Sequence, residues 1–147
     1  MADDLRVDFY VLDDASGRAR LGLVCKLAEK AYQAAQTVLI WHTHSEEIRS
    51  LDEMLWTFRD GSFVPHETLG SAGGGDAPVL LSVLTAPPAP VDLIINLAAD
   101  VPDCLAQTRR VIEIIDGDEE RRRAGRARFK AYRDRGVQPA THNIRGE

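Results

Sequence analysis

The sequence lacks any uninterrupted run of about 18 apolar residues, so we expect no membrane-spanning helix and no membrane partner. Its first residues do not form a charged-then-apolar leader, and we expect no signal peptide. Cysteine is scarce, because Cys25 and Cys104 are the only two among 147 residues. Each lies in an apolar helical context, which favours buried free thiols over a disulfide. These absences together predict a cytoplasmic protein.

Motifs that hold nucleotides or carry catalysis are missing as well. A nucleotide-binding glycine loop follows the first strand and opens a helix, whereas the first predicted strand here runs into an acidic turn at residues 13–17. The consecutive glycines Gly73, Gly74 and Gly75 precede a strand instead. No serine or cysteine stands in a nucleophile elbow, and no acid–base pair is marked. We therefore expect no cofactor and no enzymatic activity.

One pair of side chains leaves an enzymatic alternative open. His42 and His44 follow a predicted buried strand, at the edge of the sheet where α/β sites form, and Glu46 is close by. These residues could bind the ion of a metal-dependent α/β enzyme. No second histidine pair and no Asp-rich loop accompanies them, so surface or capping roles are favoured.

The order of the apolar segments predicts the fold class. Residues 7–12 are apolar, aromatic and β-branched, as in a strand, and residues 20–36 have apolar side chains at helical spacing. A strand at 37–41 and a helix opening at Ser45 repeat this order. Such alternation is typical of an α/β protein with three layers, α/β/α, and a mainly parallel sheet. We expect a Rossmann-like topology without a nucleotide site.

The second half of the chain extends the same pattern. Strands are predicted at 79–84, 91–97 and 109–115, although a helix beginning near residue 103 competes with the last of these. A final helix is predicted at 118–135, where Gly136 ends it. We assign residues 1–136 to a single α/β domain and residues 137–147 to a flexible C-terminal tail.

What the chain has in excess is positive charge in one segment. Residues 121–135 contain eight Lys or Arg side chains and one carboxylate, a net charge of +7, while the whole chain carries −5. The other 132 residues therefore carry −12. Nearly all of these cations are arginine, whose forked guanidinium suits carboxylate or phosphate. An anionic partner is indicated.

The spacing of these residues narrows the kind of partner. Arg122, Arg126, Phe129 and Arg133 fall on one face of the predicted helix, with guanidinium groups on both sides of the aromatic ring. The face could be merely solvated, could meet a nucleic-acid backbone, or could hold an acidic peptide that ends in an apolar residue. The acidic remainder of the chain would repel phosphates, which favours the peptide. Direct binding of single-stranded nucleic acid stays as the alternative.

A second group of side chains suggests a protein partner. Aromatic and apolar residues gather just after the second predicted helix, and residues of these types anchor protein interfaces. The group comprises Trp56, Phe58, Phe63, Val64 and Pro65.

Several of these segments together resemble a known family. The motifs are Leu51-Asp52-Glu53-Met54-Leu55-Trp56, then Phe63-Val64-Pro65-His66, and Arg128-Phe129-Lys130-Ala131-Tyr132-Arg133 before Gly136. Phe9-Tyr10-Val11-Leu12 and Leu93-Ile94-Ile95-Asn96-Leu97 also match. Across residues 5 to 136 the chain is similar to the chi subunit of bacterial DNA polymerase III.

The resemblance implies a non-catalytic accessory subunit of the clamp loader in DNA replication and repair. Chi-like proteins hold the acidic, Phe-terminated C-terminal tail of single-stranded DNA-binding protein, so contact with nucleic acid is mainly indirect. By position, the tail site would comprise Ile115, Arg122, Arg126 and Phe129, with Arg128 and Tyr132 adjacent. Trp56 and Phe63, with Val64 and Pro65 beside them, would contact the psi subunit or a DNA-damage helicase.

Overall fold

The computed structural model describes residues 5–61, 63–70 and 74–144. Its strands in the described chain are β1 (Arg6–Leu12), β2 (Val38–His42), β3 (His66–Thr68), β4 (Val79–Val83), β5 (Leu93–Asn96), β6 (Arg110–Ile115) and β7 (Ala140–Ile144). Its α-helices are α1 (Arg18–Gln33), α2 (Ser45–Thr57) and α3 (Glu119–Asp134). The strands form one sheet in the order β3-β4-β2-β5-β6-β1-β7, and every neighbouring pair is parallel.

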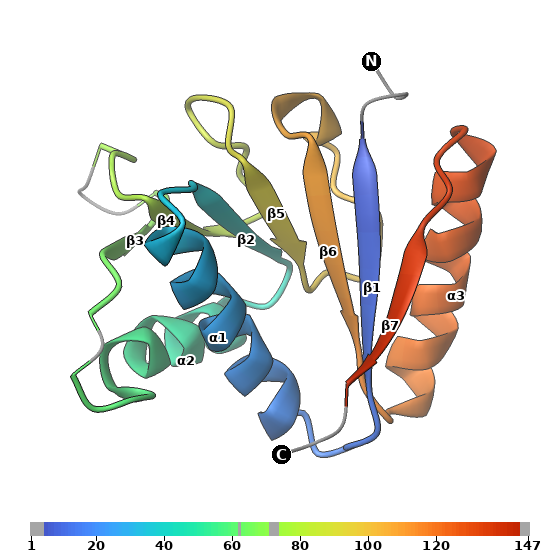
Figure 1. Ribbon diagram of the computed structural model, residues 1–147, viewed down its shortest axis with the longest axis horizontal. Coiled ribbons are helices and arrows are strands. Elements are labelled where there is room, and N and C mark those ends of the chain that lie inside the picture. The colour runs from blue at the N-terminus through green and yellow to red at the C-terminus, as the bar shows by residue number, and fades with distance from the viewer. Residues whose placement is uncertain (1–4, 62, 71–73, 145–147) are drawn as a thin grey trace.

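Helices cover both faces of this sheet, as Figure 1 shows. Helices α1 and α2 lie over one face, and α3 lies against the other. Strand β2 shows why both faces need cover: Val38 and Ile40 pack with α1 and α2, whereas Leu39 and Trp41 point the opposite way. The predicted three-layer α/β fold with a parallel sheet is therefore confirmed.

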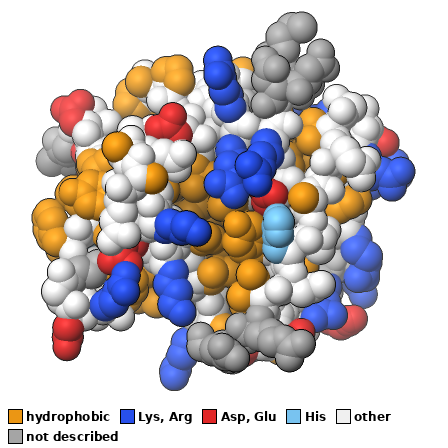
Figure 2. Space-filling view, viewed as in Figure 1, with side chains coloured by type: hydrophobic (Ala, Val, Ile, Leu, Met, Phe, Trp, Pro, Cys, Tyr) orange, Lys and Arg blue, Asp and Glu red, His pale blue; other side chains and the backbone are white. Residues whose placement is uncertain are grey.

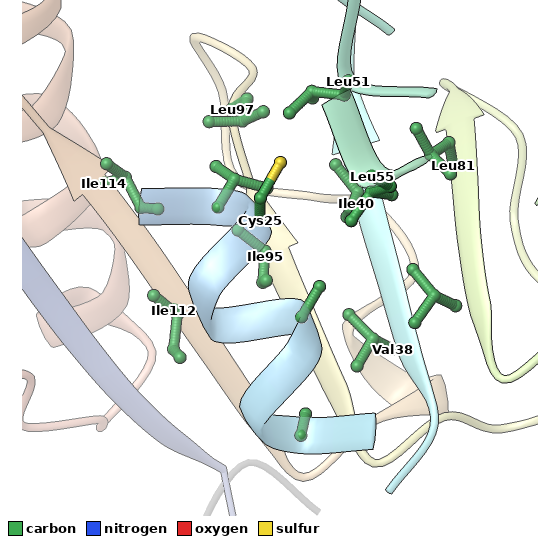
Figure 3. Packing of buried hydrophobic residues seen from close by; sticks show 14 of the residues in the cluster. Cys25, Val38, Ile40, Leu51, Leu55, Leu81, Ile95, Leu97, Ile112 and Ile114 are labelled. Carbon is green, nitrogen blue, oxygen red and sulfur yellow. The ribbon is translucent and has the colours of Figure 1, made fainter. Parts of the chain in front are cut away.

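The core between the sheet and helices α1 and α2 is apolar and closely packed (Figure 3). Cys25 lies inside it with no exposed surface, beside side chains such as Ile95 and Leu55. Burial raises the pKa of the Cys25 thiol to about 12. Cys104 is buried on the opposite side of the sheet, and both cysteines are free, as the sequence predicts.

The end of the chain differs from the expectation. Residues 137–147 are predicted to form a flexible tail, but Ala140–Ile144 adds strand β7 to the sheet beside β1. A parallel edge strand needs no continuous apolar run, because much of its surface faces solvent, and four of its five residues are exposed. The domain thus extends past residue 136, and residues 145–147 lie outside the described part of the chain.

Other segments follow the sequence less closely. Strand β3 has three residues, too few for an apolar pattern to reveal. The alternative of a helix from residue 103 reduces to a 3-10 turn at Leu105–Gln107, and β6 forms as predicted. Of the glycine-rich loop at 70–76, residues 71–73 fall outside the described chain, while Glu67 accepts hydrogen bonds from the backbone of Gly75 and Ala77.

The sheet is covered unevenly on the side of α1. Figure 2 shows hydrophobic side chains reaching the surface near the centre of this face, with Lys and Arg side chains around them. On β1 and β7, Tyr10 and Ile144 are only partly buried there. Beyond α1, the sheet edge formed by β1 and β7 is therefore nearer to solvent than the middle strands.

Candidate functional site

A groove opens between α3 and the strands beneath it, and we call it the α3 groove. Its cavity measures about 220 Å³. Apolar lining comes from β1, β6 and α3, and polar lining from α3 and β7. The lining residues are Phe9, Val11, Ile115, Gly125 and Phe129, with Arg122, Arg126 and Thr141. Pockets for whole small molecules usually measure roughly 300–1,000 Å³, so this cavity suits a single side chain.

Gly125 allows α3 to pack closely over β6. A Cβ atom at this position would meet Ile115 Cδ1 at 2.1 Å, which is far inside contact distance. Glycine inside a helix costs about 1 kcal/mol relative to alanine, so helix propensity alone disfavours it here. The close approach of helix and strand accounts for it, and any side chain would force Ile115 to move in the α3 groove.

Phe129 forms one side of the groove and divides it from a second depression. Its ring lies 5.2 Å from the ring of Phe9, centroid to centroid, so it is held by an aromatic contact from below. On its other side, Arg126 and Arg133 line an open depression together with Lys130 and Asp134. The ring is therefore flanked by guanidinium groups, as the helical spacing predicts.

Half of the cations in residues 121–135 are neutralised within the protein. The ion pairs join Arg121 to Asp116, Arg123 to Glu120, Arg128 to Glu113, and Lys130 to Asp134. Arg122, Arg126, Arg133 and Arg135 form no ion pair with any residue that the structure describes. Three of these four are the arginines that the spacing places on the face of Phe129.

Arg122 is oriented even without an ion pair. Its Nε donates a hydrogen bond to the backbone oxygen of Asp116 at 3.0 Å, which holds the guanidinium beside the α3 groove. Arg126, one turn further along, is exposed. The two side chains offer several N–H donors to one anion at the mouth of an apolar cavity.

Arg128 and Tyr132 lie beneath α3 and do not line the groove. Arg128 Nε donates to Glu113 at 2.8 Å, and the Tyr132 hydroxyl donates to the same carboxylate at 2.6 Å. Asn96 supplies a third donor at 2.9 Å. All four residues are buried. Burial raises the pKa of Glu113, opposed by Arg128 and by the hydrogen bonds from Tyr132 and Asn96. These residues anchor α3 to β6 from within.

A larger cavity of about 730 Å³ lies at the carboxyl ends of the strands, where α/β proteins bind nucleotides. Most of its charged lining side chains form ion pairs within the protein. Arg20, with 3% of its surface exposed, donates to Glu47 at 3.1 Å, and Arg121 pairs with Asp116. The helices that border it begin at Ser45 and Glu119 without a glycine-rich phosphate loop.

In the structure, His42 is not available as a ligand for the metal ion of the enzymatic alternative. His42 is fully buried, its Nδ1 accepts a hydrogen bond from the backbone of Thr43 at 2.8 Å, and its Nε2 donates to Glu47 at 2.6 Å. Burial lowers the pKa of His42 in spite of Glu47, which keeps the ring neutral. Both ring nitrogens are engaged. Within the described residues, no group of three or more His, Cys, Asp or Glu could hold a metal ion.

Of the residues predicted to form the second partner surface, some are exposed to solvent and one lies in the core. Trp56 and Phe63 are 50% and 61% exposed, and their rings lie 5.6 Å apart. Val64 is fully buried in the core under α2, and Pro65 is only partly exposed. The exposed surface is therefore formed by two aromatic rings, with Val64 as their support.

Four residues of the α3 groove are not among the site residues that the sequence predicts. Phe9 and Val11 belong to the first predicted strand, and Thr141 lies in the segment expected to be a tail. Gly125 carried a usable signal, because an isolated glycine in a helical pattern often marks close packing.

Comparison with known proteins identifies the family of the chain. The structure is that of a three-layer α/β protein with an arginine-flanked groove on α3. Residues 5–140 match the family described as DNA polymerase III chi subunit, HolC, and the chain belongs to that family. Its members are accessory subunits of DNA polymerase III.

Individual relatives cover nearly the whole chain. The chi subunit of Pseudomonas aeruginosa DNA polymerase III is 37% identical over 95% of this chain and 96% of that protein. The chi subunit of Escherichia coli is 29% identical over 85% and 88%. Among solved structures, the C-terminal domain of the DEAD-box protein Dbp5 matches with a TM-score of 0.65 over 95% of this chain and 92% of that one. Its 11% identity shows a shared fold alone.

The described helices include none with the length and apolarity that a membrane span requires.

Proposed function

We propose that the protein is a non-catalytic adaptor that links the clamp loader, through a psi-like subunit, to single-stranded DNA-binding protein. The α3 groove holds the acidic C-terminal tail of that protein, with the terminal phenylalanine in the cavity. Ile115, Arg122, Arg126 and Phe129 contact the tail. Arg128 and Tyr132 support them by fixing α3 to the sheet.

The observation that carries this proposal is that particular arginines lack an internal carboxylate partner. The described chain neutralises Arg121, Arg123, Arg128 and Lys130, but leaves the guanidinium groups of Arg122 and Arg126 without a carboxylate beside the α3 groove. Paired cations cannot contribute much to an external anion, whereas unpaired ones can. An apolar cavity for one side chain, next to donors for carboxylates, matches an acidic peptide with an aromatic end.

A nucleic-acid backbone fits this surface less well. Binding a backbone needs a run of cations along several phosphates, and four of the seven cations on α3 are already in internal ion pairs. The cavity also accepts one side chain, whereas single strands bind on successive exposed stacking rings. Binding of bare oligonucleotide at physiological salt, without a binding protein, would favour the nucleic-acid alternative.

The test is calorimetry with an acidic peptide ending in Asp-Asp-Xaa-Pro-Phe. We expect one site of micromolar strength, about −8 kcal/mol, that weakens as salt rises. The matched control is the same peptide without its terminal phenylalanine, which keeps the acidic residues and leaves the cavity empty. Equal affinity for both peptides would contradict the assignment of the aromatic ring to the α3 groove.

The exposed rings of Trp56 and Phe63 are the proposed surface for the psi-like subunit, or for a helicase that uses the same surface. Trp56→Ala is expected to weaken co-purification with this partner by more than ten-fold, because buried aromatic anchors contribute about 2 kcal/mol or more to interfaces. The affinity for the peptide at the α3 groove, measured by calorimetry, should stay within two-fold of wild type. Substitutions at distant sites act independently of one another to within about 0.5 kcal/mol.

The matched control for Trp56→Ala is Leu84→Ala, which removes a different hydrophobic side chain that is 55% exposed. This variant should assemble normally. If Trp56→Ala also abolished peptide binding, its effect would be on folding and the partner surface would lie elsewhere.

A further inference from the structure

Strand β7 contributes to the α3 groove from the edge of the sheet. Thr141 pairs in register with Phe9, and both residues line the cavity. Within the described chain, β7 has β1 as its single strand neighbour, and residues 140–143 are exposed. One wall of the groove therefore stands on an exposed edge strand of the sheet.

The opposite face of β7 carries the contacts that hold it. His142 follows Thr141 and so points to the other side of the sheet. Its Nε2 lies 2.9 Å from Asp8 Oδ1, and its ring lies 5.1 Å from the ring of Tyr10. Asp8 is 1% exposed and is fixed on its other oxygen by Arg110 at 3.1 Å, so the acceptor for His142 is rigid.

We infer that β7 is part of the peptide site, with Thr141 as a wall that limits the side chain admitted and His142 as the positioning residue that sets this wall. The inference rests on the proposed function and extends it to a strand outside α3. Peptide binding and the pairing of β7 with β1 are then linked. A peptide that contacts Thr141 favours paired β7, and paired β7 raises the affinity for the peptide by the same factor.

The wall is tested by adding bulk to each face of β7 in turn. Thr141→Phe directs a ring into the α3 groove and should weaken the Phe-terminated peptide at least ten-fold by calorimetry. Ala140→Phe adds the same ring to the same strand on the opposite face, and it should change affinity less than two-fold. Equal effects of the two variants, or none from Thr141→Phe, would overturn the assignment of Thr141.

The positioning role is tested at His142. His142→Ala removes the donor to Asp8 and should weaken the peptide about five-fold or more, the lower range of coupling between linked events. His142→Gln keeps an N–H donor on a side chain of similar reach and should restore most of the affinity. Normal affinity of the alanine variant, or a glutamine variant as weak as the alanine variant, would exclude a positioning role.

Hydrogen exchange separates positioning from general stability. In the wild-type protein, saturating peptide should slow exchange of the β7 amides that pair with β1. Amides of β3, the strand at the opposite edge of the sheet, should not change. Uniform slowing at both edges, or none in β7, would contradict the linkage.

These results also separate the inference from the function on which it rests. If wild-type protein does not bind the peptide, both the proposed function and the inference about β7 fail. If it binds, loses affinity in Arg126→Ala and keeps it in Thr141→Phe, the proposed function stands and the role of β7 is overturned.

Discussion

Arg128→Leu is expected to lower the free energy of unfolding by about 3–5 kcal/mol, the usual cost of breaking a buried ion pair from one side. Arg128 is 6% exposed, and its partner Glu113 is fully buried. Without the guanidinium, the carboxyl group must either stay charged in apolar surroundings or take up a proton, which its raised pKa favours. Urea denaturation followed by circular dichroism measures the change, with an unchanged slope against urea as the sign of an intact native state.

A second substitution identifies the cause of this loss. Glu113→Gln in the Arg128→Leu background removes the buried charge but keeps an acceptor for the Tyr132 hydroxyl, so the double variant should recover stability relative to the single one. A double variant no more stable than Arg128→Leu would mean that the loss came from packing of the arginine stem. A loss below about 1 kcal/mol in the single variant would show that the pair is unimportant for folding.

Arg126→Ala is expected to weaken the acidic, Phe-terminated peptide roughly ten-fold or more. A hydrogen bond to a charged group contributes about 1.5–3 kcal/mol, and 1.4 kcal/mol corresponds to ten-fold. Arg126 is exposed and lines the α3 groove, with no ion pair to any described residue. Its removal therefore takes away a contact to the peptide and leaves no internal carboxylate unpaired. Calorimetry at fixed salt measures the change.

Arg123→Ala is the matched control for this variant. It removes the same charge from the same helix, but Arg123 is exposed, pairs with Glu120 and does not line the groove. Its effect should be less than two-fold and should vanish at high salt, as expected for a distant exposed charge. Equal affinities of wild type and Arg126→Ala would contradict the site, and equal losses in both variants would indicate a general attraction by charge.

The predictions from sequence succeeded where burial leaves a pattern. Strands β2 and β5 are buried on both faces and consist mainly of apolar residues, so nearly continuous apolar runs reveal them. Strand β7, with its sequence ATHNI, is exposed at the sheet edge and has no such run. Its position depends on β1 at the other end of the chain, a long-range pairing that local pattern does not encode.

The site residues also divide into those that helical spacing reveals and those whose role depends on the folded structure. Spacing correctly places Arg122, Arg126 and Phe129 on one face of α3. Arg128 and Tyr132 lie roughly 100° round the helix from that face, by the 3.6-residue turn, and they point to the sheet. The family motif RFKAYR contains residues of both faces, so the motif alone does not separate peptide contacts from anchors. Burial of Glu113 explains the difference, and burial is a property of the folded chain.

The partial neutralisation of α3 has a kinetic consequence. Because the chain outside residues 121–135 carries −12, an acidic tail is repelled over most of the surface and attracted at one stripe of unpaired arginines. Encounters then become directional, and salt should slow association much more than it speeds dissociation. In the proposed complex, release requires withdrawal of an apolar ring from its cavity and loss of short-range hydrogen bonds to arginine, and salt should affect these contacts less than the long-range attraction. A tail held in this way would leave at a rate set by close contacts, while ionic strength would govern mainly its arrival.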